Sequence, residues 1–161
     1  MLVFAEVLEL RLALPRRICG CCCPAGAGSF ADADPQLTLD NKLVGPAHFR
    51  PGDLLRALLR RVSMLMSFHT GADLETDFRA LTDLANQARM AEAELSLAAQ
   101  RRWSANKADL IKMDGLLGGF LLDLRGLEPL WPYLWLGQWV HAGKGTVMGL
   151  GAIHLREALD F

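Results

Sequence analysis

A glycine-dense segment near the end of the chain holds the residues best suited to contact a phosphate. It runs from Gly143 to Gly151, contains Lys144, and follows His141. Glycine adopts backbone conformations with positive φ, so successive N–H groups can approach an anion closely, and the lysine adds a positive charge. These features suit a phosphodiester backbone. A simple turn before a last strand is the alternative, and the sequence pattern leaves both open.

The segment does not fit the two common nucleotide-binding motifs. A P-loop would need glycine at position 138 and Ser or Thr after Lys144, but the chain has Gln138 and Gly145 there. The dinucleotide fingerprint opens a helix, whereas this segment precedes an expected strand at 152–155. The pattern therefore indicates neither ATP nor NAD as a ligand, and we expect no cofactor.

The cysteines do not indicate a metal site. All four lie between Cys19 and Cys23. They are too close together for one chelate to present four thiolates tetrahedrally. We expect reduced thiols in a loop and no bound metal.

Length and composition are those of one ordinary globular domain. The chain has 161 residues, 52% of them hydrophobic, and a formal net charge of −1. A nucleic-acid-binding domain is usually basic, so an RNA partner has to be argued from local features. The apolar stretch 127–140 is short and contains Glu128 and two prolines, which excludes a membrane span there. We expect a cytoplasmic protein with no membrane partner.

Hydrophobic periodicity predicts the elements that position the glycine-dense segment. Apolar residues alternate in strands and recur every 3.6 residues in helices. The pattern first predicts a strand at 7–14 and a long irregular connection at 16–50 with at most a short strand at 37–39. A helix from Pro51 and a second amphipathic helix at 74–89, with Phe78 facing inward, are predicted next. A hairpin of 93–99 and 111–124, a short helix from Leu127 and the last strand complete the order.

Three details of this pattern are expectations that a structure can check. Gly118-Gly119 inside a strand implies a bulge or a close backbone approach, because glycine adds no packing there. Gly137 is expected to end the short helix. Trp131, Trp135 and Trp139 are expected to fill the core at helical spacing.

The predicted order of elements defines a fold class. Omitting one extra helix, it is βαββαβ, which is the split βαβ pattern of an α+β, ferredoxin-like (RRM-like) domain. We expect residues 1–161 to form a single such domain.

The stretch WLGQWVHAGKGTVMGLGAIHL, residues 135–155, resembles the C-terminal signature of a known family. It is similar to the RAMP-superfamily endoribonucleases that process CRISPR precursor RNA, whose last segment reads G-x-x-x-H-x-G-K-x-T-x-x-G-x-G before a strand. Those positions are Gly137, His141, Gly143, Lys144, Thr146, Gly149 and Gly151. Residues 49–71 resemble the first helix of the family's second domain, and 113–124 resemble its glycine-containing strand. The resemblance covers about 43–156.

The resemblance implies a RAMP domain that binds CRISPR repeat RNA or crRNA. It implies metal-independent cleavage, in which the ribose 2′-OH attacks the adjacent phosphate. Family members typically carry two ferredoxin-like domains with the catalytic histidine in the first, and this chain resembles the second. Whether the chain is an enzyme by itself is therefore open. Other Cas proteins, or a missing N-terminal half, are the further expected partners.

Four histidines could supply an acid or a base for such a reaction. His141 is the best placed, close to Lys144, and is our candidate catalytic residue; a hydrogen-bonded structural role is the alternative. His69 ends the first helix, where the helix dipole alone favours it. His48 lies in an expected loop and His154 in a strand.

The expected RNA-binding residues combine the glycine-dense segment with two arginines of the hairpin. They are Gly143, Lys144, Gly145, Thr146, Gly149, Gly151, Arg101 and Arg102. The hairpin and the segment can approach one another on a ferredoxin-like sheet, and Trp103 could stack on a base. Solvated charged faces explain the arginines equally well. Three functions stay open: a processing endoribonuclease, a non-catalytic crRNA-binding subunit, and a domain unrelated to RNA.

Overall fold

The computed structural model describes residues 7–13, 38–39, 42–99, 101–104, 106 and 108–157. The cysteine cluster Cys19–Cys23 and most of the expected connection at 16–50 lie outside these residues. Within them, no helix is long and apolar enough to cross a membrane.

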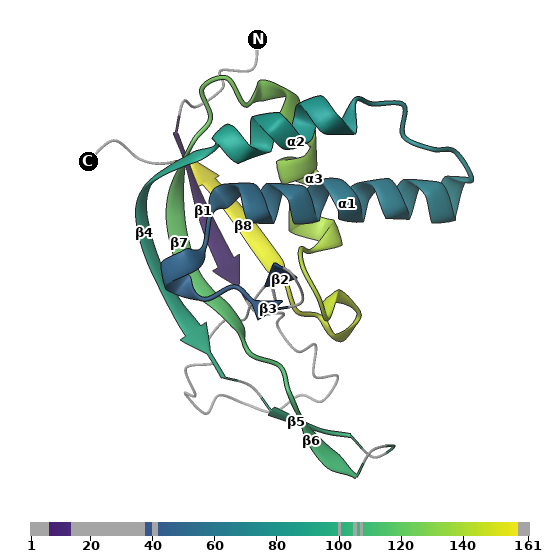
Figure 1. The fold of residues 1–161 in the computed structure, drawn as a ribbon, viewed down its shortest axis with the longest axis vertical. Coiled ribbons are helices and arrows are strands. Elements are labelled where there is room, and N and C mark those ends of the chain that lie inside the picture. Colours follow the sequence, from purple (N-terminus) through teal and green to yellow (C-terminus); the bar gives the residue numbers. More distant parts are fainter. Residues whose placement is uncertain are drawn as a thin grey trace, which may run out of the picture.

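The main sheet has four strands in the order β4-β7-β1-β8, and each neighbouring pair is antiparallel. The strands are β1 (Val7–Ala13), β4 (Arg89–Ala98), β7 (Gly115–Asp123) and β8 (Ala152–Glu157). Helices follow β1 and separate β7 from β8, as Figure 1 shows. This order and connectivity are those of a ferredoxin-like fold, so the predicted α+β class is confirmed.

Three helices pack together beside the sheet: α1 (Pro51–Thr70), α2 (Phe78–Gln87) and α3 (Trp131–Val140) (Figure 1). The first begins as the sequence predicts, because Pro51 occupies its first turn and the Asp53 carboxylate accepts a hydrogen bond from the Arg50 N–H at 3.2 Å. It ends at Gly71, which has a φ of 68°.

The extra helix α2 is shorter than predicted. The Asp77 carboxylate caps its start by accepting hydrogen bonds from the N–H groups of Arg79 and Ala80, both at 3.0 Å. Phe78, expected to face inward, is 36% exposed, whereas Leu81 and Ala85 are buried. The apolar periodicity in the sequence extends beyond both ends of α2, into the coil before it and into β4, so the helix was predicted too long.

The predicted hairpin is confirmed, and its two arms extend beyond the end of the main sheet. The β4–β7 pairing reaches Ala98 opposite Gly115. Beyond it, β5 (Arg101–Ser104) and β6 (Asp109–Lys112) continue as a two-stranded ribbon that projects away from the helices (Figure 1).

Short elements complete the chain. The strands β2 (Thr38–Leu39) and β3 (Lys42–Leu43) pair with one another, and β2 lies where a short strand is predicted. Three 3₁₀ helices are η1 (Pro46–His48), η2 (Glu128–Leu130) and η3 (Thr146–Met148).

The core lies between the helices and one face of the sheet. Its most deeply buried side chains come from α1, α3, β7, β8 and η2 and are Leu54, Leu55, Leu58, Leu116, Leu122, Leu130, Leu134 and Ile153. Gly118 is confirmed as a point of close backbone approach. Its φ is 128°, and a Cβ atom there would lie 1.9 Å from the carbonyl oxygen of Glu94 on β4.

The expectation that Gly137 ends the last helix is wrong. The helix α3 continues to Val140, and Gly137 is buried inside it. A Cβ atom at this position would lie 2.6 Å from Ile153 Cδ1 and 2.8 Å from Leu58 Cδ2. The glycine is therefore needed for α3 to pack closely on α1 and β8, not to stop the helix.

The expectation that three tryptophans fill the core is confirmed for Trp131, which packs against the core cluster, and is wrong for Trp135 and Trp139. Trp135 is 50% exposed and Trp139 is 61% exposed, while Trp131 is half-buried. Tyr133, Leu134 and Gly137 form the buried side of α3 instead. Because α3 is apolar on every side, its periodicity could not show which side meets the core.

Candidate nucleic-acid interface

The glycine loop, which we define as residues 143–151, leaves α3 at His141 and returns directly into β8. Four of its glycines have φ values between 77° and 81°, a region that side chains disfavour. Gly151 is the most constrained, because a Cβ atom there would lie 1.9 Å from the Ala142 carbonyl oxygen. The Ala142 N–H donates to the Gly151 carbonyl at 2.8 Å and closes the base of the loop. The glycine pattern is thus required by the shape of the loop itself.

Part of the loop backbone is bonded within the loop. The Gly145 carbonyl accepts hydrogen bonds from the N–H groups of Met148, at 2.8 Å, and Leu150, at 3.2 Å. The Gly149 N–H donates to the Thr146 carbonyl at 3.0 Å. These three amides are already engaged, so an anion at the loop would have to be met by other groups, among which the exposed Lys144 carries the charge.

His141 bridges the two ends of the glycine loop. Its backbone has a φ of 61°, its side chain is half-buried, and its Nδ1 lies 3.0 Å from the Leu150 carbonyl oxygen. A carbonyl only accepts, so this contact requires a proton on Nδ1, and in the neutral imidazole the lone pair then lies on Nε2. This geometry fits the alternative that His141 has a hydrogen-bonded structural role, and its Nε2 can still accept a proton. Its part in catalysis stays a prediction.

The other three histidines lie on separate elements. His48 is in η1, His69 is in the last turn of α1, and His154 is on β8; all three are exposed. Their positions give no reason to prefer any of them over His141.

The projecting ribbon reaches the glycine loop, as the ferredoxin-like topology predicts. Arg102 on β5 places Nη1 2.7 Å from the sulfur of Met148 in the loop. Met113, directly after β6, and Leu150 in the loop also form a small buried apolar cluster. The loop and the ribbon therefore form one continuous surface that contains Arg102.

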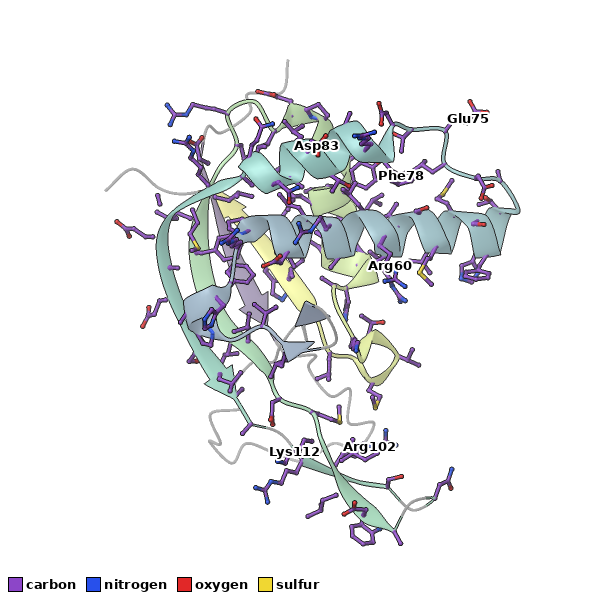
Figure 2. All side chains as sticks on the ribbon, viewed as in Figure 1. Arg60, Glu75, Phe78, Asp83, Arg102 and Lys112 are labelled. Carbon is purple, nitrogen blue, oxygen red and sulfur yellow. The ribbon has the colours of Figure 1, made fainter. Side chains whose placement is uncertain are left out.

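This surface is locally basic. The ribbon segment 101–112 contains four Lys or Arg residues and one Asp. Arg101, Arg102 and Lys112 are exposed, and Figure 2 shows the labelled Arg102 and Lys112 on the projecting ribbon. Trp103, between them in sequence, is 61% exposed and available to stack on a base. Lys107, which lies between β5 and β6 in the sequence, is outside the described residues.

Arg61 is a positioning residue that the sequence pattern did not single out. Its Nε donates to the carbonyl oxygen of Val140 at 3.2 Å, so this α1 side chain satisfies a carbonyl at the end of α3 just before His141. The two residues are 79 positions apart. Only the packing of α1 against α3 brings them together, and no local motif could have indicated the contact.

The described part of this surface holds no group of metal ligands. Among the described residues, no three His, Cys, Asp or Glu side chains are grouped to hold a metal ion. Two surface hollows occur elsewhere, one of about 290 Å³ between α1 and α2 and one of about 520 Å³ beside Arg89 and Asp123. No residue of the glycine loop lines either of them.

A ferredoxin-like domain with a basic β-ribbon packed on a C-terminal glycine loop is the class that the fold and the site define. The family model of the CRISPR-associated endoribonuclease Cas6 matches residues 34–153. The chain belongs to this family, which confirms the resemblance seen in the sequence. No curated protein sequence matches the chain.

Solved structures support the same fold. A Cas6 product complex is 18% identical with a TM-score of 0.53, and the match covers 94% of this chain and 53% of that one. The Cas6 of Thermus thermophilus is 15% identical with a TM-score of 0.54, covering 94% and 53%. A partial Cas6-RT-Cas1–Cas2 complex is 18% identical with a TM-score of 0.57, covering 98% and 23%. The chain therefore spans about half the length of the Cas6 structures it matches. At these identities the likeness establishes the fold alone.

Proposed function

We propose that the chain binds CRISPR repeat RNA through the surface formed by the glycine loop and the β5–β6 ribbon. The observation that carries the proposal is the 2.7 Å contact between Arg102 and Met148, because it joins the ribbon's cations to the loop that holds Lys144. Phosphates of a bound strand would neutralise these cations, and Trp103 would stack on an unpaired base. Relatives solved as a product complex and a substrate mimic complex support a substrate of this kind.

The reaction we propose for a cleaving chain is metal-independent attack of a ribose 2′-oxygen on the adjacent phosphorus. The bond to the 5′-oxygen breaks, which leaves a 2′,3′-cyclic phosphate and a 5′-OH. The lone pair on His141 Nε2 would take the 2′-OH proton, and a water molecule would protonate the leaving 5′-oxygen. Lys144 and Arg102 would offset the charge that develops on the phosphate. Residues 1–161 would act as one ferredoxin-like domain in this step.

A second candidate function is a non-catalytic crRNA-binding subunit. The hydrogen bond between His141 Nδ1 and the Leu150 carbonyl favours it, because this contact gives the histidine a sufficient structural role. The complex of a relative named Cas6-RT-Cas1–Cas2 supports other Cas proteins as partners of such a subunit. This function predicts RNA binding without cleavage.

The experiment that separates the two functions uses end-labelled repeat RNA with the purified chain in EDTA. Binding and cleavage are followed on the same gels, and the product ends are identified. A cyclic phosphate that disappears in His141→Ala supports the endoribonuclease. A shifted but intact RNA supports the binding subunit. Absence of any shift contradicts both.

Lys144→Ala tests the proposed surface directly. Removing one cation from a phosphate contact should weaken binding and lower the slope of log K against log salt by about one. Arg79→Ala is the matched control, because Arg79 is an exposed cation on α2 and lies outside the proposed surface. Equal slopes for the parent and Lys144→Ala would remove Lys144 from the RNA-binding surface.

A further inference from the structure

The tip of the glycine loop, which we define as η3, carries the most exposed large apolar side chain of the described residues. Val147 lies in the middle of η3 and is 95% exposed, and Met148 after it is 49% exposed. A single exposed apolar residue is common on protein surfaces. Val147 differs from such residues in how its position is fixed and in which groups lie beside it.

Hydrogen bonds and packing hold Val147 in place. The Gly145 carbonyl accepts hydrogen bonds from the N–H groups of Met148, one residue after the valine, and of Leu150. Leu150 is buried in one cluster with Met113, directly after the ribbon. Because the tip is already ordered, a ligand that contacts Val147 loses little affinity in ordering it.

Cations flank the apolar tip. Lys144 is exposed and is the only charged residue of the glycine loop. Arg102, labelled in Figure 2, places Nη1 2.7 Å from the Met148 sulfur. Ile111 pairs directly with Arg102 in the ribbon, and opposed residues share one face, so Ile111 also lies on the side of the ribbon toward the loop. The surface beside Val147 therefore combines two cations with apolar side chains.

We propose that Val147 acts as a wedge, a side chain that enters between the two bases on either side of the phosphate held by Lys144 and Arg102. This inference rests on the proposed function and concerns the same surface. Apolar side chains that enter a stack of bases open it, while nearby cations hold the backbone. The tip of the glycine loop supplies both parts of this arrangement on an ordered backbone.

Separation of the two bases is what the proposed cleavage requires. The attacking 2′-oxygen, the phosphorus and the leaving 5′-oxygen must lie nearly in line while one bond forms and the other breaks. Stacked A-form nucleotides hold the 2′-oxygen away from that line, so the strand has to bend at the cleaved linkage. A wedge supplies this bend, which makes Val147 a positioning residue. It also favours a substrate whose bases are unpaired at this linkage, because those bases separate most easily.

A protein partner fits the tip less well than RNA does. A stable protein interface buries about 1,200 Å² or more, and charged residues are depleted at its centre. Here a single valine projects between the exposed cations Lys144 and Arg102. Such a small apolar tip with cations beside it suits a phosphodiester strand and its bases.

The test uses 2-aminopurine, whose fluorescence rises when its base is unstacked, in repeat RNA bound by the full chain in EDTA. The fluorescent base is placed at one position after another, and a 2′-deoxyribose at any linkage that the chain cleaves prevents the reaction. Two adjacent positions are expected to brighten by about twofold or more on binding the parent. Val147→Ser should abolish this rise. Its RNA affinity should fall by no more than about tenfold at an unchanged salt slope, because no charge is removed.

Two variants serve as controls. Val147→Leu keeps the tip apolar and should retain the rise in fluorescence. Leu110→Ser removes another exposed apolar side chain. Leu110 pairs with Trp103, next to Arg102 in β5, and therefore lies on the other face of the ribbon. Leu110→Ser should also retain the rise.

Two results would overturn the inference. If the parent binds RNA and no position brightens, the bases stay stacked; this result needs no variant to fold. If Val147→Ser brightens the RNA as the parent does, another group separates the bases. Both results leave the RNA-binding surface in place. Failure of the parent to shift repeat RNA on a gel contradicts the proposed function itself, so the two failures are distinguishable.

Discussion

Gly137 is the residue on which the packing of three elements depends. It brings the backbone of α3 against Leu58 of α1 and Ile153 of β8, both of which are completely buried. Any side chain at this position must displace one of these two. Since Ile153 lies in β8, the strand that follows the glycine loop, a displacement there would also move the candidate RNA-binding surface.

Gly137→Val is expected to destabilise the chain by about 1–2 kcal/mol. Forcing extra atoms into a packed core costs about 1–3 kcal/mol, and the improved helix propensity returns less than 1 kcal/mol of that. Urea unfolding measures the difference. Gly45→Val serves as the control, because nothing lies within 4 Å of a Cβ atom there. Identical midpoints for the parent and Gly137→Val would contradict the packing shown by the structure.

Asp123 links stability to pH at the end of β7. Hydrogen bonds from the Arg125 side chain, at 2.7–3.2 Å, lower the pKa of the Asp123 carboxyl from 3.8 to about 2, and a backbone N–H of Arg125 adds to the effect. A lowered pKa in the folded state means that the charged carboxylate stabilises the fold above the unfolded value. This contribution is lost as the pH falls from about 4 to about 2.

Asp123→Asn should therefore reduce the acid sensitivity of folding. Thermal unfolding followed from pH 5 to pH 2 is expected to show a smaller fall in melting temperature for this variant than for the parent. Asp83→Asn, which removes an exposed carboxylate of α2, is the control and should follow the parent curve. A parallel fall in all three proteins would show that the Asp123–Arg125 pair has no influence on stability.

At the scale of elements, the sequence was sufficient to predict a helix or strand where one side of that element is polar. The helix α1 has an unambiguous apolar stripe, a proline in its first turn and an acidic cap, and it was predicted from Pro51 onward. The long hairpin was predicted because its two strands alternate or are continuously apolar around a polar turn. Gly118 was predicted to mark a bulge or a close backbone approach, because glycine weakens a strand without adding packing, and the structure shows the close approach.

The orientation of α3 could not be predicted for a physical reason. A helix of WPYLWLGQWV has an apolar residue at nearly every position, so every rotation about its axis buries some apolar surface. The actual rotation is selected by Leu58 and Ile153, which meet Gly137 from distant parts of the chain. The local pattern assigns the largest side chains to the core, and this assignment is wrong for Trp135 and Trp139.

The candidate RNA-binding surface was predictable in part. Its glycine loop, Lys144 and His141 follow from spacing, and the approach of the hairpin follows from the topology. The particular contacts, Arg102 with Met148 and Arg61 with Val140, join residues 46 and 79 positions apart. Such contacts depend on side-chain packing between elements, which no single segment encodes.

At the scale of the whole molecule, charge is distributed unevenly. The segment 101–112 has four cations and one carboxylate, a net charge of +3, which leaves −4 on the rest of the chain. A polyanion is therefore attracted to the ribbon and repelled elsewhere. The overall net charge of −1 conceals this difference, so the absence of a basic composition did not exclude an RNA partner. Because the ribbon lies beyond the β4–β7 pairing, the main sheet can form without it.

This separation allows RNA binding to be removed without loss of the fold. Replacing residues 101–112 by Asn-Gly, a favoured two-residue hairpin turn, retains the register of Ala98 with Gly115 and keeps Met113 beside Leu150. We expect the melting temperature to change little. Binding of repeat RNA should weaken strongly, and the salt slope should fall by two to four, since each lost phosphate contact removes about one.

A second variant distinguishes charge from shape. Arg102→Gln combined with Lys112→Gln leaves the β5–β6 ribbon in place and removes only two of its exposed cations, so the salt slope should fall by about two. If the shortened chain folds and still binds repeat RNA with the parent's affinity and slope, the RNA contacts lie on another face of the sheet. If it binds RNA weakly while the double substitution binds as the parent does, the ribbon acts through Trp103 or its other cations, and Arg102 and Lys112 contribute nothing.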